Sequence, residues 1–179
     1  MSAVEIRTAH TADLDGATLA SARALLVDVF EGDLSDTDWE HALGGVHAPA
    51  WDGDELIGHA SVVQRRLLHG GRALRTGYIE AVGVRRDRRR EGHGAALMAA
   101  LERVLKGAYE PGALSAADEA AEFYTALGWT RWQGTSYALT PQGVIRTEDE
   151  DGGIFVLPLT APVDVTGALT CDWRDGDVW

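Results

Sequence analysis

Residues 78 to 94 decide the fold, and they read Tyr78-Ile79-Glu80-Ala81-Val82-Gly83-Val84-Arg85-Arg86-Asp87-Arg88-Arg89-Arg90-Glu91-Gly92-His93-Gly94. The first seven residues are mostly apolar and β-branched, which is typical of a strand in the middle of a sheet. After the arginines, residues 94–105 place Leu97, Leu101 and Leu105 on one helical stripe that would pack on that sheet. The stretch therefore predicts a buried strand, a basic turn and an amphipathic helix.

The basic turn has the features of an anion site. It holds five of the 16 basic residues of the chain within six positions. Gly92 and Gly94 let the backbone turn its amides inward, and these amides and the positive end of the helix would cradle a pyrophosphate, with arginines near a further phosphate. A nuclear-localisation or nucleic-acid patch is the alternative, but it would need neither the glycines nor the apolar helix.

Two common nucleotide ligands are not favoured by this turn. The chain has no GxxxxGK[ST] sequence, and Leu97 follows Gly92-x-Gly94 where a dinucleotide fingerprint has its third glycine. The turn therefore predicts neither an ATP site nor an NAD site.

The other elements follow from periodicity and turn residues. Helices are predicted over 14–30 and 118–127, with a short helix that a Thr37–Glu40 capping box begins and that runs to about Leu43. Strands are predicted over 4–7, 46–51, 55–68, 75–84, 113–115, 129–132, 136–139 and 154–159. This order predicts the α/β class, with one mixed (α+β) sheet and helices on both faces.

Length and composition bound the organisation. A chain of 179 residues, 45% of them hydrophobic, predicts a single domain over 1–179. We expect an acidic C-terminal tail, about 160–179, to be irregular and to dock toward the substrate site through Trp173 and Trp179. No basic leader precedes an apolar run, and no eighteen-residue apolar stretch occurs, so we expect a cytoplasmic protein with no membrane partner.

Cysteine and histidine usage gives no sign of a metal. The single cysteine, Cys171, excludes an internal disulfide and a zinc spacing, and we expect it to be structural. The six histidines show no ligand spacing, so His41, His47, His59 and the others are interpreted as packing or surface residues.

The net charge and its distribution along the sequence bear on which partners the protein binds. The formal net charge of −12 makes nucleic acid an unlikely partner and favours a cationic small molecule, although it could also merely keep the protein dispersed. Acids concentrate in two stretches: residues 31–40 hold five and no Lys or Arg, and residues 144–179 hold eight against two arginines. The run Glu148–Asp151 has a plain alternative as a solvated loop.

Two motifs carry a family resemblance. Arg89-Arg90-Glu91-Gly92-His93-Gly94 resembles the R/Q-x-x-G-x-G/A acyl-CoA loop of the GNAT acetyltransferases, and it stands between a central strand and a helix as that loop does. About thirty residues on, Ala121-Glu122-Phe123-Tyr124-Thr125-Ala126-Leu127-Gly128-Trp129 is similar to the second signature of this family, an aromatic pair on a helix closed by Gly and an aromatic residue. The two motifs in this order are specific.

The resemblance implies a fold and a cofactor site. The GNAT acyl-CoA N-acyltransferase fold has a mostly antiparallel central sheet with a splayed parallel pair at the cofactor site. The cosubstrate would be acetyl-CoA, with no metal. The residues that would bind it are Val82, Gly83, Val84, Arg89, Arg90, Glu91, Gly92, His93 and Gly94.

Acetyl transfer from a thioester to an amine needs a base for the amine, an acid for the leaving thiolate and a hydrogen-bond donor that polarises the thioester carbonyl. Glu80, within the apolar strand, is the candidate general base, directly or through a water; the alternative is a strand glutamate whose head reaches solvent. The resemblance implies that Tyr124 protonates the leaving thiolate, the alternative being an aromatic core residue, and that the Val82 amide polarises the carbonyl.

A narrower resemblance extends over nearly the whole chain. The matching stretches resemble the aminoglycoside 2′-N-acetyltransferases, and they are Gly32-Asp33-Leu34, Thr37–His41, Leu43–Gly45, Gly107–Tyr109, Phe155–Pro158 and Cys171–Trp179. This implies direct transfer, in a ternary complex, to the 2′-amine of aminoglycoside antibiotics by a homodimer that confers resistance. The expected substrate-binding residues are Asp33, Asp38, Glu80, Ala81, Ser115, Asp149, Glu150, Asp177 and Trp179 with its carboxylate.

Two alternatives stay open. The first is a GNAT enzyme that acetylates a protein N-terminus, a lysine or a metabolic or cell-wall polyamine, which would keep the loop and Tyr124 but would not need the acidic tail. The second is a non-catalytic acyl-CoA-binding or cation-binding module.

Overall fold

The computed structural model describes residues 3–179, so Met1 and Ser2, which the single-domain prediction includes, lie outside the described residues. The chain forms two compact units. The first comprises residues up to Val63 together with Ile79–Val104, and the second comprises Gln64–Tyr78 and Leu105–Trp179. Strands β5 (Glu55–His69) and β6 (Arg72–Val84) and helix α3 (His93–Ala108) contribute residues to both units.

The first unit is built from short strands on the N-terminal part of β5. Strand β1 (Glu5–Ile6) pairs antiparallel with β4 (Ala50–Asp52), and β2 (Ala9–His10) pairs antiparallel with β3 (Val46–His47). Both β3 and β4 pair antiparallel with β5. The predicted strands at 4–7, 46–51 and 55–68 are thus present, the middle one divided in two by Ala48 and Pro49.

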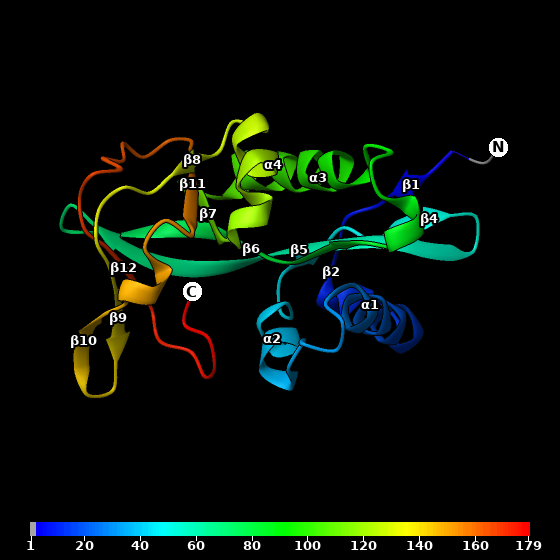
Figure 1. Cartoon of the computed structure of the whole chain (residues 1–179), viewed down its shortest axis with the longest axis horizontal. Helices are drawn as coiled ribbons and strands as arrows, with labels where there is room; N and C mark the ends of the chain where they lie inside the picture. The colour runs from blue at the N-terminus through cyan, green and yellow to red at the C-terminus, as the bar shows by residue number, and fades with distance from the viewer. Residues whose placement is uncertain (1–2) are drawn as a thin grey trace. The chain divides into compact units, whose positions relative to one another are not determined.

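Helices cover both sides of this part of the sheet. Helices α1 (Gly16–Val29) and α2 (Asp36–His41) lie on one side of the strands, and α3 lies on the other (Figure 1). The Asp15 side chain caps α1 by accepting the Thr18 amide at 2.7 Å. The mixed sheet with helices on both faces is as predicted.

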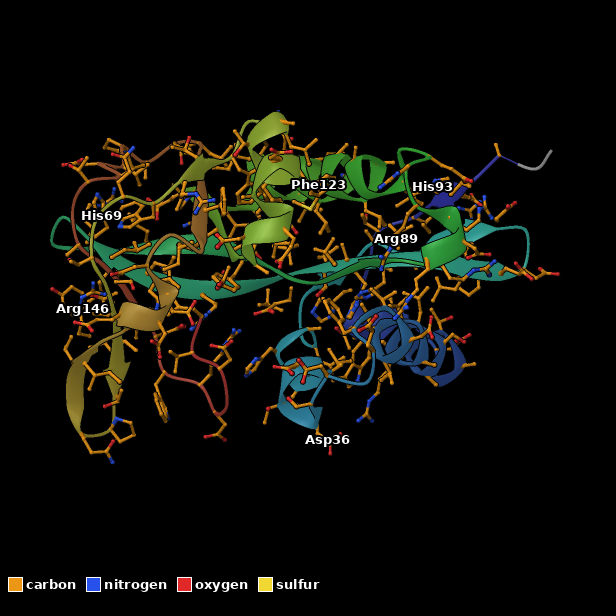
Figure 2. The ribbon with its side chains drawn as sticks, in the orientation of Figure 1. Asp36, His69, Arg89, His93, Phe123 and Arg146 are labelled. Carbon is orange, nitrogen blue, oxygen red and sulfur yellow. The ribbon has the colours of Figure 1, made fainter. Side chains whose placement is uncertain are left out.

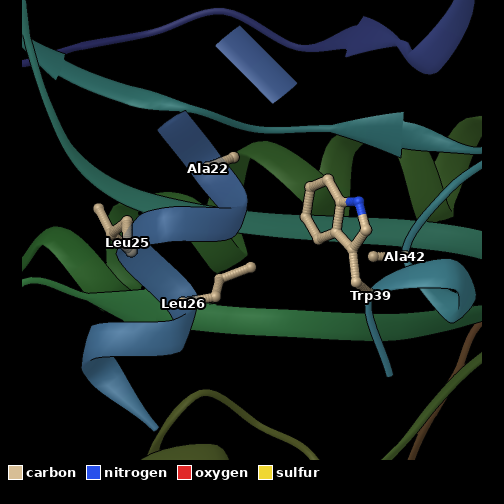
Figure 3. Close-up of a cluster of buried hydrophobic side chains, with 5 residues drawn as sticks. All are labelled: Ala22, Leu25, Leu26, Trp39 and Ala42. Atoms are coloured by element: carbon tan, nitrogen blue, oxygen red, sulfur yellow. The ribbon is translucent and has the colours of Figure 1, made fainter. Parts of the chain in front are cut away.

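A cluster of apolar side chains holds α1 and α2 together. Its buried members are Ala22, Leu25 and Leu26 from α1 with Trp39 and Ala42 from α2 and its end (Figure 3). Leu26 and Ala42 are fully buried, and Gly83 of β6 lies so close to Leu26 and Val29 that an added Cβ would be 3.0 Å from the Leu26 Cδ2. Side-chain burial of this kind contributes about 2 kcal/mol per large residue.

The predicted cap of α2 is wrong by two residues. Ser35, not Thr37, is the N-cap, and Asp38, not Glu40, completes the capping box by accepting the Ser35 amide at 2.8 Å. Because Asp and Glu both serve at the third helical position, the run Ser35–Glu40 contains two capping-box patterns, and the one starting at Ser35 forms. The helix then ends at His41 rather than at about Leu43.

The second unit holds the remaining strands. Strand β7 (Pro111–Ser115) pairs parallel with β6 at Gly77–Gly112 and Tyr78–Ala113, and antiparallel with β11 (Ile154–Pro158), which also pairs with β8 (Thr130–Arg131). A 3₁₀ turn, η3 (Asp118–Ala120), leads into α4 (Ala121–Ala126). The predicted helix at 118–127 therefore has an irregular first turn.

The C-terminal part of this unit is more ordered than predicted. Strand β9 (Ser136–Thr140) pairs antiparallel with the unpredicted β10 (Gly143–Arg146) and parallel with β12 (Leu169–Cys171), which itself pairs antiparallel with β5. The prediction of an irregular tail is thus wrong for 169–171. Trp179 is buried, but Trp173 is 47% exposed, so the prediction that both tryptophans dock is wrong for Trp173.

Four elements of the first unit meet in a buried chain of polar groups. Thr11, of the 3₁₀ turn η1 (Thr11–Asp13), lies with its Oγ1 2.7 Å from the His47 Nε2. The His47 Nδ1 lies 2.9 Å from the His59 Nε2, and the His59 Nδ1 lies 2.9 Å from the Ala81 carbonyl oxygen. Both rings are inaccessible to solvent, as the packing interpretation of these histidines predicts.

Burial lowers the pKa of both histidines to about 4, with His10 adding repulsion at His47 and His47 adding it at His59.

No helix within residues 3–179 is long and apolar enough to cross a membrane.

The histidine chain makes the stability of the fold depend on pH. In the unfolded chain these histidines take up protons near pH 6.5, whereas in the folded chain they stay neutral down to about pH 4. The unfolded state therefore binds more protons between these values, and the unfolding free energy falls as the pH falls from 6.5 to 4, on the order of 3 kcal/mol for each histidine. Urea unfolding at pH 7.5, 6 and 5 measures the loss.

The control for this experiment is His41→Gln, which removes a histidine that is not part of the hydrogen-bonded histidine chain. The unfolding free energy of this variant is expected to depend on pH as that of the wild type does. An unfolding free energy that stays constant between pH 7.5 and 5 would contradict the neutral, buried pair.

Candidate active site

The end of β6 departs from a regular strand at Ala81. Its φ is 53°, a left-handed conformation that non-glycine residues seldom adopt, and the residues on both sides of it are extended. Glu80, Ala81 and Val82 are half-buried, while the next residue, Gly83, is buried. The Ser61 hydroxyl donates to the Glu80 carbonyl at 3.4 Å. Glu80, the candidate base, and Val82, whose amide is the candidate hydrogen-bond donor to the thioester carbonyl, thus flank the strained residue Ala81.

The turn after β6 has the backbone of an anion site. Arg86–Arg88 form a 3₁₀ turn, η2, after which Arg90 and Gly92 have φ values of 64° and 86°. The Ala96 amide bonds to the Gly92 carbonyl at 3.0 Å, so the amides of residues 93–95 precede the helical ladder and have no acceptor within α3. Free amides and the positive end of a sixteen-residue helix fit a phosphate group.

The arginines of this turn divide into two groups. Arg85, Arg86 and Arg88 are engaged by acids: Arg85 by Glu55 and Asp87, Arg86 by Glu31, and Arg88 by Asp52 and Glu91. Three of the five arginines predicted to surround a phosphate are therefore neutralised by the protein itself, and the acids that neutralise them are residues that motif reasoning did not use.

Arg89 and Arg90 are exposed and, unlike the exposed Arg86, form no ion pair with an acid of residues 3–179. Arg89 and His93 flank the entry into α3 (Figure 2), and the Arg89 Nε donates to the Val84 carbonyl at 3.3 Å. Within residues 3–179, the Arg90 side chain makes no hydrogen bond or ion pair. These two guanidiniums and the amides of residues 93–95 are the groups that would hold an anionic cosubstrate.

Glu91, the acid within the loop motif, stays ionised, and two basic side chains are paired with it. Its carboxylate accepts from the His93 Nε2 at 2.9 Å and from the Arg88 Nε at 3.1 Å, and these bonds, His93 first, lower the pKa of Glu91. Across residues 3–179, no group of three or more His, Cys, Asp or Glu side chains is placed to hold a metal ion.

Tyr124 lies in the second unit among aromatic rings. Its ring centroid is 5.0 Å from that of Phe123, 6.0 Å from that of Phe155 and 6.4 Å from that of Trp129, and the side chain is 7% exposed. Burial raises the pKa of Tyr124 to about 12. The phenol is therefore protonated at any working pH, as a proton donor must be.

Five of the predicted substrate-binding residues come together in the second unit. The Ser115 hydroxyl donates to the Glu150 Oε2 at 3.1 Å, and Glu150 lies in the 3₁₀ turn η4 (Glu148–Glu150). The Asp177 Oδ1 accepts the Trp179 amide at 3.2 Å. Burial and then the charge of Asp177 raise the pKa of Glu150, and Asp149 adds to the repulsion. These carboxylates form a crowded acidic cluster, residues Asp149, Glu150 and Asp177, beside Trp179.

Further contacts fix the chain end at this cluster. The Trp179 Nε1 donates to the Thr147 hydroxyl at 3.0 Å, and the Arg174 guanidinium donates to the Asp177 carbonyl at 2.8 Å and to a terminal oxygen of Trp179 at 3.0 Å. A hollow of about 460 Å³ lies beside it, lined by residues 145–150 and Val178. The lining combines apolar Ile145 and Val178 with three acids and with Arg146, whose guanidinium is bonded to Asp151. The excess of acids in this lining suits a cation with an apolar frame.

The remaining predicted substrate residues lie in the first unit and differ in availability. Asp33 is exposed. The Asp38 carboxylate is committed to the α2 cap, where it accepts both the amide and the hydroxyl of Ser35.

Cys171 has the environment of a structural residue. It is fully buried, its Sγ donates to the Val178 carbonyl at 3.3 Å, and burial raises the pKa of the thiol to about 11. A thiol in this state is a poor nucleophile.

Motif reasoning missed the residues that orient these groups. His59 and Ser61 contact the backbone of Ala81 and Glu80, and Thr147 and Arg174 hold the chain end. The only sequence signal for His59 is a polar residue inside the apolar run 55–63, and it does not show which backbone atom the ring contacts.

Comparison with known proteins places this geometry in a family. The model of the acetyltransferase (GNAT) family matches residues 18–129, more than half of the chain. An aminoglycoside 2′-N-acetyltransferase from Mycolicibacterium fortuitum is 54% identical over 177 residues, which are 97% of this chain and 91% of that relative.

Solved structures agree on the fold. The GNAT family N-acetyltransferase YhbS from Escherichia coli, crystallised in complex with CoA, superposes with a TM-score of 0.66 at 16% identity over 96% of this chain and 91% of that one. Escherichia coli ElaA gives a TM-score of 0.62 at 22% identity over 88% of this chain and 99% of that one. With a family model over most of the chain and a close relative over nearly all of it, the chain belongs to the acetyltransferase (GNAT) family and is an acetyl-CoA-dependent N-acetyltransferase.

Proposed function

We propose that the protein transfers the acetyl group of acetyl-CoA directly to the 2′-amine of aminoglycoside antibiotics and thereby confers resistance. The observation that carries the substrate class is the acidic cluster Asp149, Glu150 and Asp177, beside the 460 Å³ hollow. Crowded carboxylates repel one another, so a ligand with several ammonium groups would relieve this repulsion while forming charge-assisted hydrogen bonds. The name of the Mycolicibacterium fortuitum relative supports the same substrate.

The turn between β6 and α3 would bind the diphosphate of acetyl-CoA. Its support is the set of amides at residues 93–95, the left-handed Gly92 and the exposed Arg89 and Arg90. The extended residues Val82, Gly83 and Val84 would line the path of the acyl arm. The cosubstrate supplies an activated thioester, and the protein supplies orientation and charge stabilisation.

Three groups would carry the chemistry. Glu80 would take a proton from the substrate ammonium, directly or through a water, so that the amine attacks the thioester carbonyl carbon. The Val82 amide would stabilise the charge that develops on the carbonyl oxygen, and the Tyr124 phenol would protonate the sulfur as the carbon–sulfur bond breaks. Cys171 is buried and protonated, which supports direct transfer in a ternary complex over an acyl-cysteine route.

We further propose a cytoplasmic homodimer. Acetyl-CoA is an intracellular metabolite, and Val144 and Ile145 of β10 are 59% and 47% exposed, which favours their coverage by another protein surface. The other candidate is acetylation of a protein N-terminus, a lysine or a metabolic or cell-wall polyamine. A peptide amine does not need the acidic cluster. A polyamine would also suit the cluster, and the name of the Mycolicibacterium fortuitum relative favours an aminoglycoside over it.

The first test separates these substrates. Initial rates with acetyl-CoA are measured for matched aminoglycosides that carry a 2′-amine or a 2′-hydroxyl, for spermidine and for lysine-containing peptides. Only the 2′-amino compounds are expected to turn over efficiently, and mass spectrometry should find one added acetyl group. Acetylation of peptides alone would overturn the aminoglycoside proposal in favour of an enzyme that acetylates proteins. Binding of acetyl-CoA without turnover of any amine would favour a non-catalytic binding module.

The second test addresses the acidic cluster. Glu150→Gln removes a charge but keeps a hydrogen-bonding side chain next to Ser115, so the KM for the aminoglycoside should rise about tenfold, as expected for one charge-assisted bond. The KM for acetyl-CoA should stay within about twofold. Glu119→Gln, an exposed acid in η3, is the matched control and should change neither value. An unchanged amine KM in Glu150→Gln would remove Glu150 from the binding site.

The third test addresses the base and the acid. Glu80→Gln should lower kcat/KM by about 10²- to 10⁴-fold near neutral pH, and the defect should shrink at high pH, where the amine is already neutral in solution. Tyr124→Phe keeps the aromatic packing and should lower kcat by roughly tenfold or more with little change in either KM. A Glu80→Gln defect that is constant with pH would assign Glu80 to binding instead.

A further inference from the structure

We propose that His59, aligned by His47 and Thr11, is a positioning residue that aims the Val82 amide at the thioester carbonyl. The proposal rests on the role given to Val82 under the proposed function. It concerns the buried polar chain of the first unit, which runs from Thr11 through both histidines to the Ala81 carbonyl.

The two ends of the chain fix the direction of every hydrogen bond in it. The Ala81 carbonyl can only accept, so the His59 Nδ1 carries the proton and its Nε2 is the acceptor of a neutral ring. The His47 Nδ1 must then donate to His59, which leaves the His47 Nε2 to accept from the Thr11 hydroxyl. At the far end the Thr11 Oγ1 accepts the Gly44 amide at 2.9 Å.

The Thr11 hydroxyl also lies 3.4 Å from the Gly45 carbonyl oxygen, but the His47 Nε2, at 2.7 Å, is the closer acceptor. Both rings are neutral, in agreement with the lowered pKa that burial gives them. Because a carbonyl cannot release a proton, the chain cannot conduct one to the site. What it can do is hold the last acceptor in one orientation.

The held acceptor belongs to the peptide unit that carries the proposed catalytic amide. The Ala81 carbonyl and the Val82 N–H are parts of one peptide plane, and a trans peptide points them in opposite directions. The described chain contains no cis peptide bond. A bond from His59 to the oxygen therefore sets the direction of the N–H, and it also polarises the peptide so that the N–H is a stronger donor.

This peptide would not hold its orientation alone. Ala81 is in the left-handed region, with a φ of 53°, and such a residue persists where its surroundings over-determine it. The Ser61 hydroxyl holds the preceding peptide through the Glu80 carbonyl, and the Trp39 ring packs 6.1 Å from the His59 ring, between centroids. The rings are rigid and fully buried, so the orientation they impose is well defined.

Matched variants of His59 separate the hydrogen bond from the packing. His59→Asn places an amide N–H near the position of the lost Nδ1–H and should keep the grip on Ala81, whereas His59→Gln reaches the Nε2 position instead, and His59→Leu has no donor. We expect kcat to fall about 10- to 100-fold in the Leu and Gln variants, less than the loss of a whole oxyanion donor, and to be largely restored in the Asn variant. The KM for acetyl-CoA and for the amine should change by less than about threefold.

A spectroscopic readout tests the aim of the amide without turnover. Acetyl-CoA labelled with ¹³C at the carbonyl is bound in the absence of amine, and its carbonyl stretch is recorded by isotope-edited infrared spectroscopy. A hydrogen bond from Val82 should move the stretch to lower frequency in the wild type and in His59→Asn, and this shift should be reduced in the Leu and Gln variants.

The far end of the chain gives a second pair of variants. Thr11→Val removes the proton donor to His47 and should lower kcat about threefold and weaken the infrared shift, whereas Thr11→Ser should behave as the wild type. His41→Gln is the control histidine variant and should change nothing. This pair keeps the proposal testable if His59→Leu does not fold, which thermal unfolding will show.

The outcomes distinguish this proposal from the one it rests on. A wild-type complex without a carbonyl shift would overturn the role of Val82 and this inference with it. A wild-type shift that persists in the Leu and Gln variants would overturn the inference alone, even if kcat fell, because His59 would then act through stability. A shift lost in Leu and Gln and kept in Asn establishes it.

Discussion

The left-handed peptide at Ala81 is the constraint on which the rest of the site depends. A non-glycine residue in this region costs about 1 kcal/mol or more, and the strand that contains it would otherwise continue as regular extended chain. The cost is offset by hydrogen bonds from His59 and Ser61 to adjacent carbonyls and by the closeness of Gly83 to Leu26 and Val29. Because the left-handed conformation is confined to Ala81, the neighbouring residues of β6 stay extended and the core packing continues past it.

The distribution of charge follows the two kinds of ligand. Although the net charge is −12, the turn before α3 is strongly basic, and its excess is trimmed by acids that bind Arg85, Arg86 and Arg88. Arg89 and Arg90 stay exposed for an anion. In the second unit the balance is reversed, because the charge of Asp177 raises the pKa of Glu150, while the nearby Arg174 donates to the main-chain oxygens of Asp177 and Trp179. One acidic chain therefore offers separate positive and negative surfaces.

The sequence predicted the elements that periodicity and glycine control and missed those that depend on distant partners. The strand, turn and helix within 78–105 are present as predicted, because they are specified by local pattern. Helix α1 and strands β5 and β6 are also present, with bounds that differ from the predicted ones by one to three residues. Strands β10 and β12 are short and form through pairing with other strands, β10 with β9 and β12 with β9 and β5, so no local signal marks them. The long-range contacts of this kind are Arg88–Asp52 and Thr11–His47, each 36 positions apart, and His59–Ala81, 22 positions apart. No spacing rule connects such residues.

Under the proposed function, main-chain groups would bind the diphosphate and stabilise the charge on the thioester oxygen. This explains why motifs are informative about the loop but do not identify the residues that support it. A main-chain N–H occurs at every residue except proline, so neither the Val82 side chain nor the Glu91 side chain identifies the donors. The direction of a main-chain N–H is set by torsion angles, and we propose that buried side chains such as His47 and His59 hold these angles at Ala81. A substitution at those positions would therefore act on the reaction through one peptide plane, while the motif residues that identify the family remained unchanged.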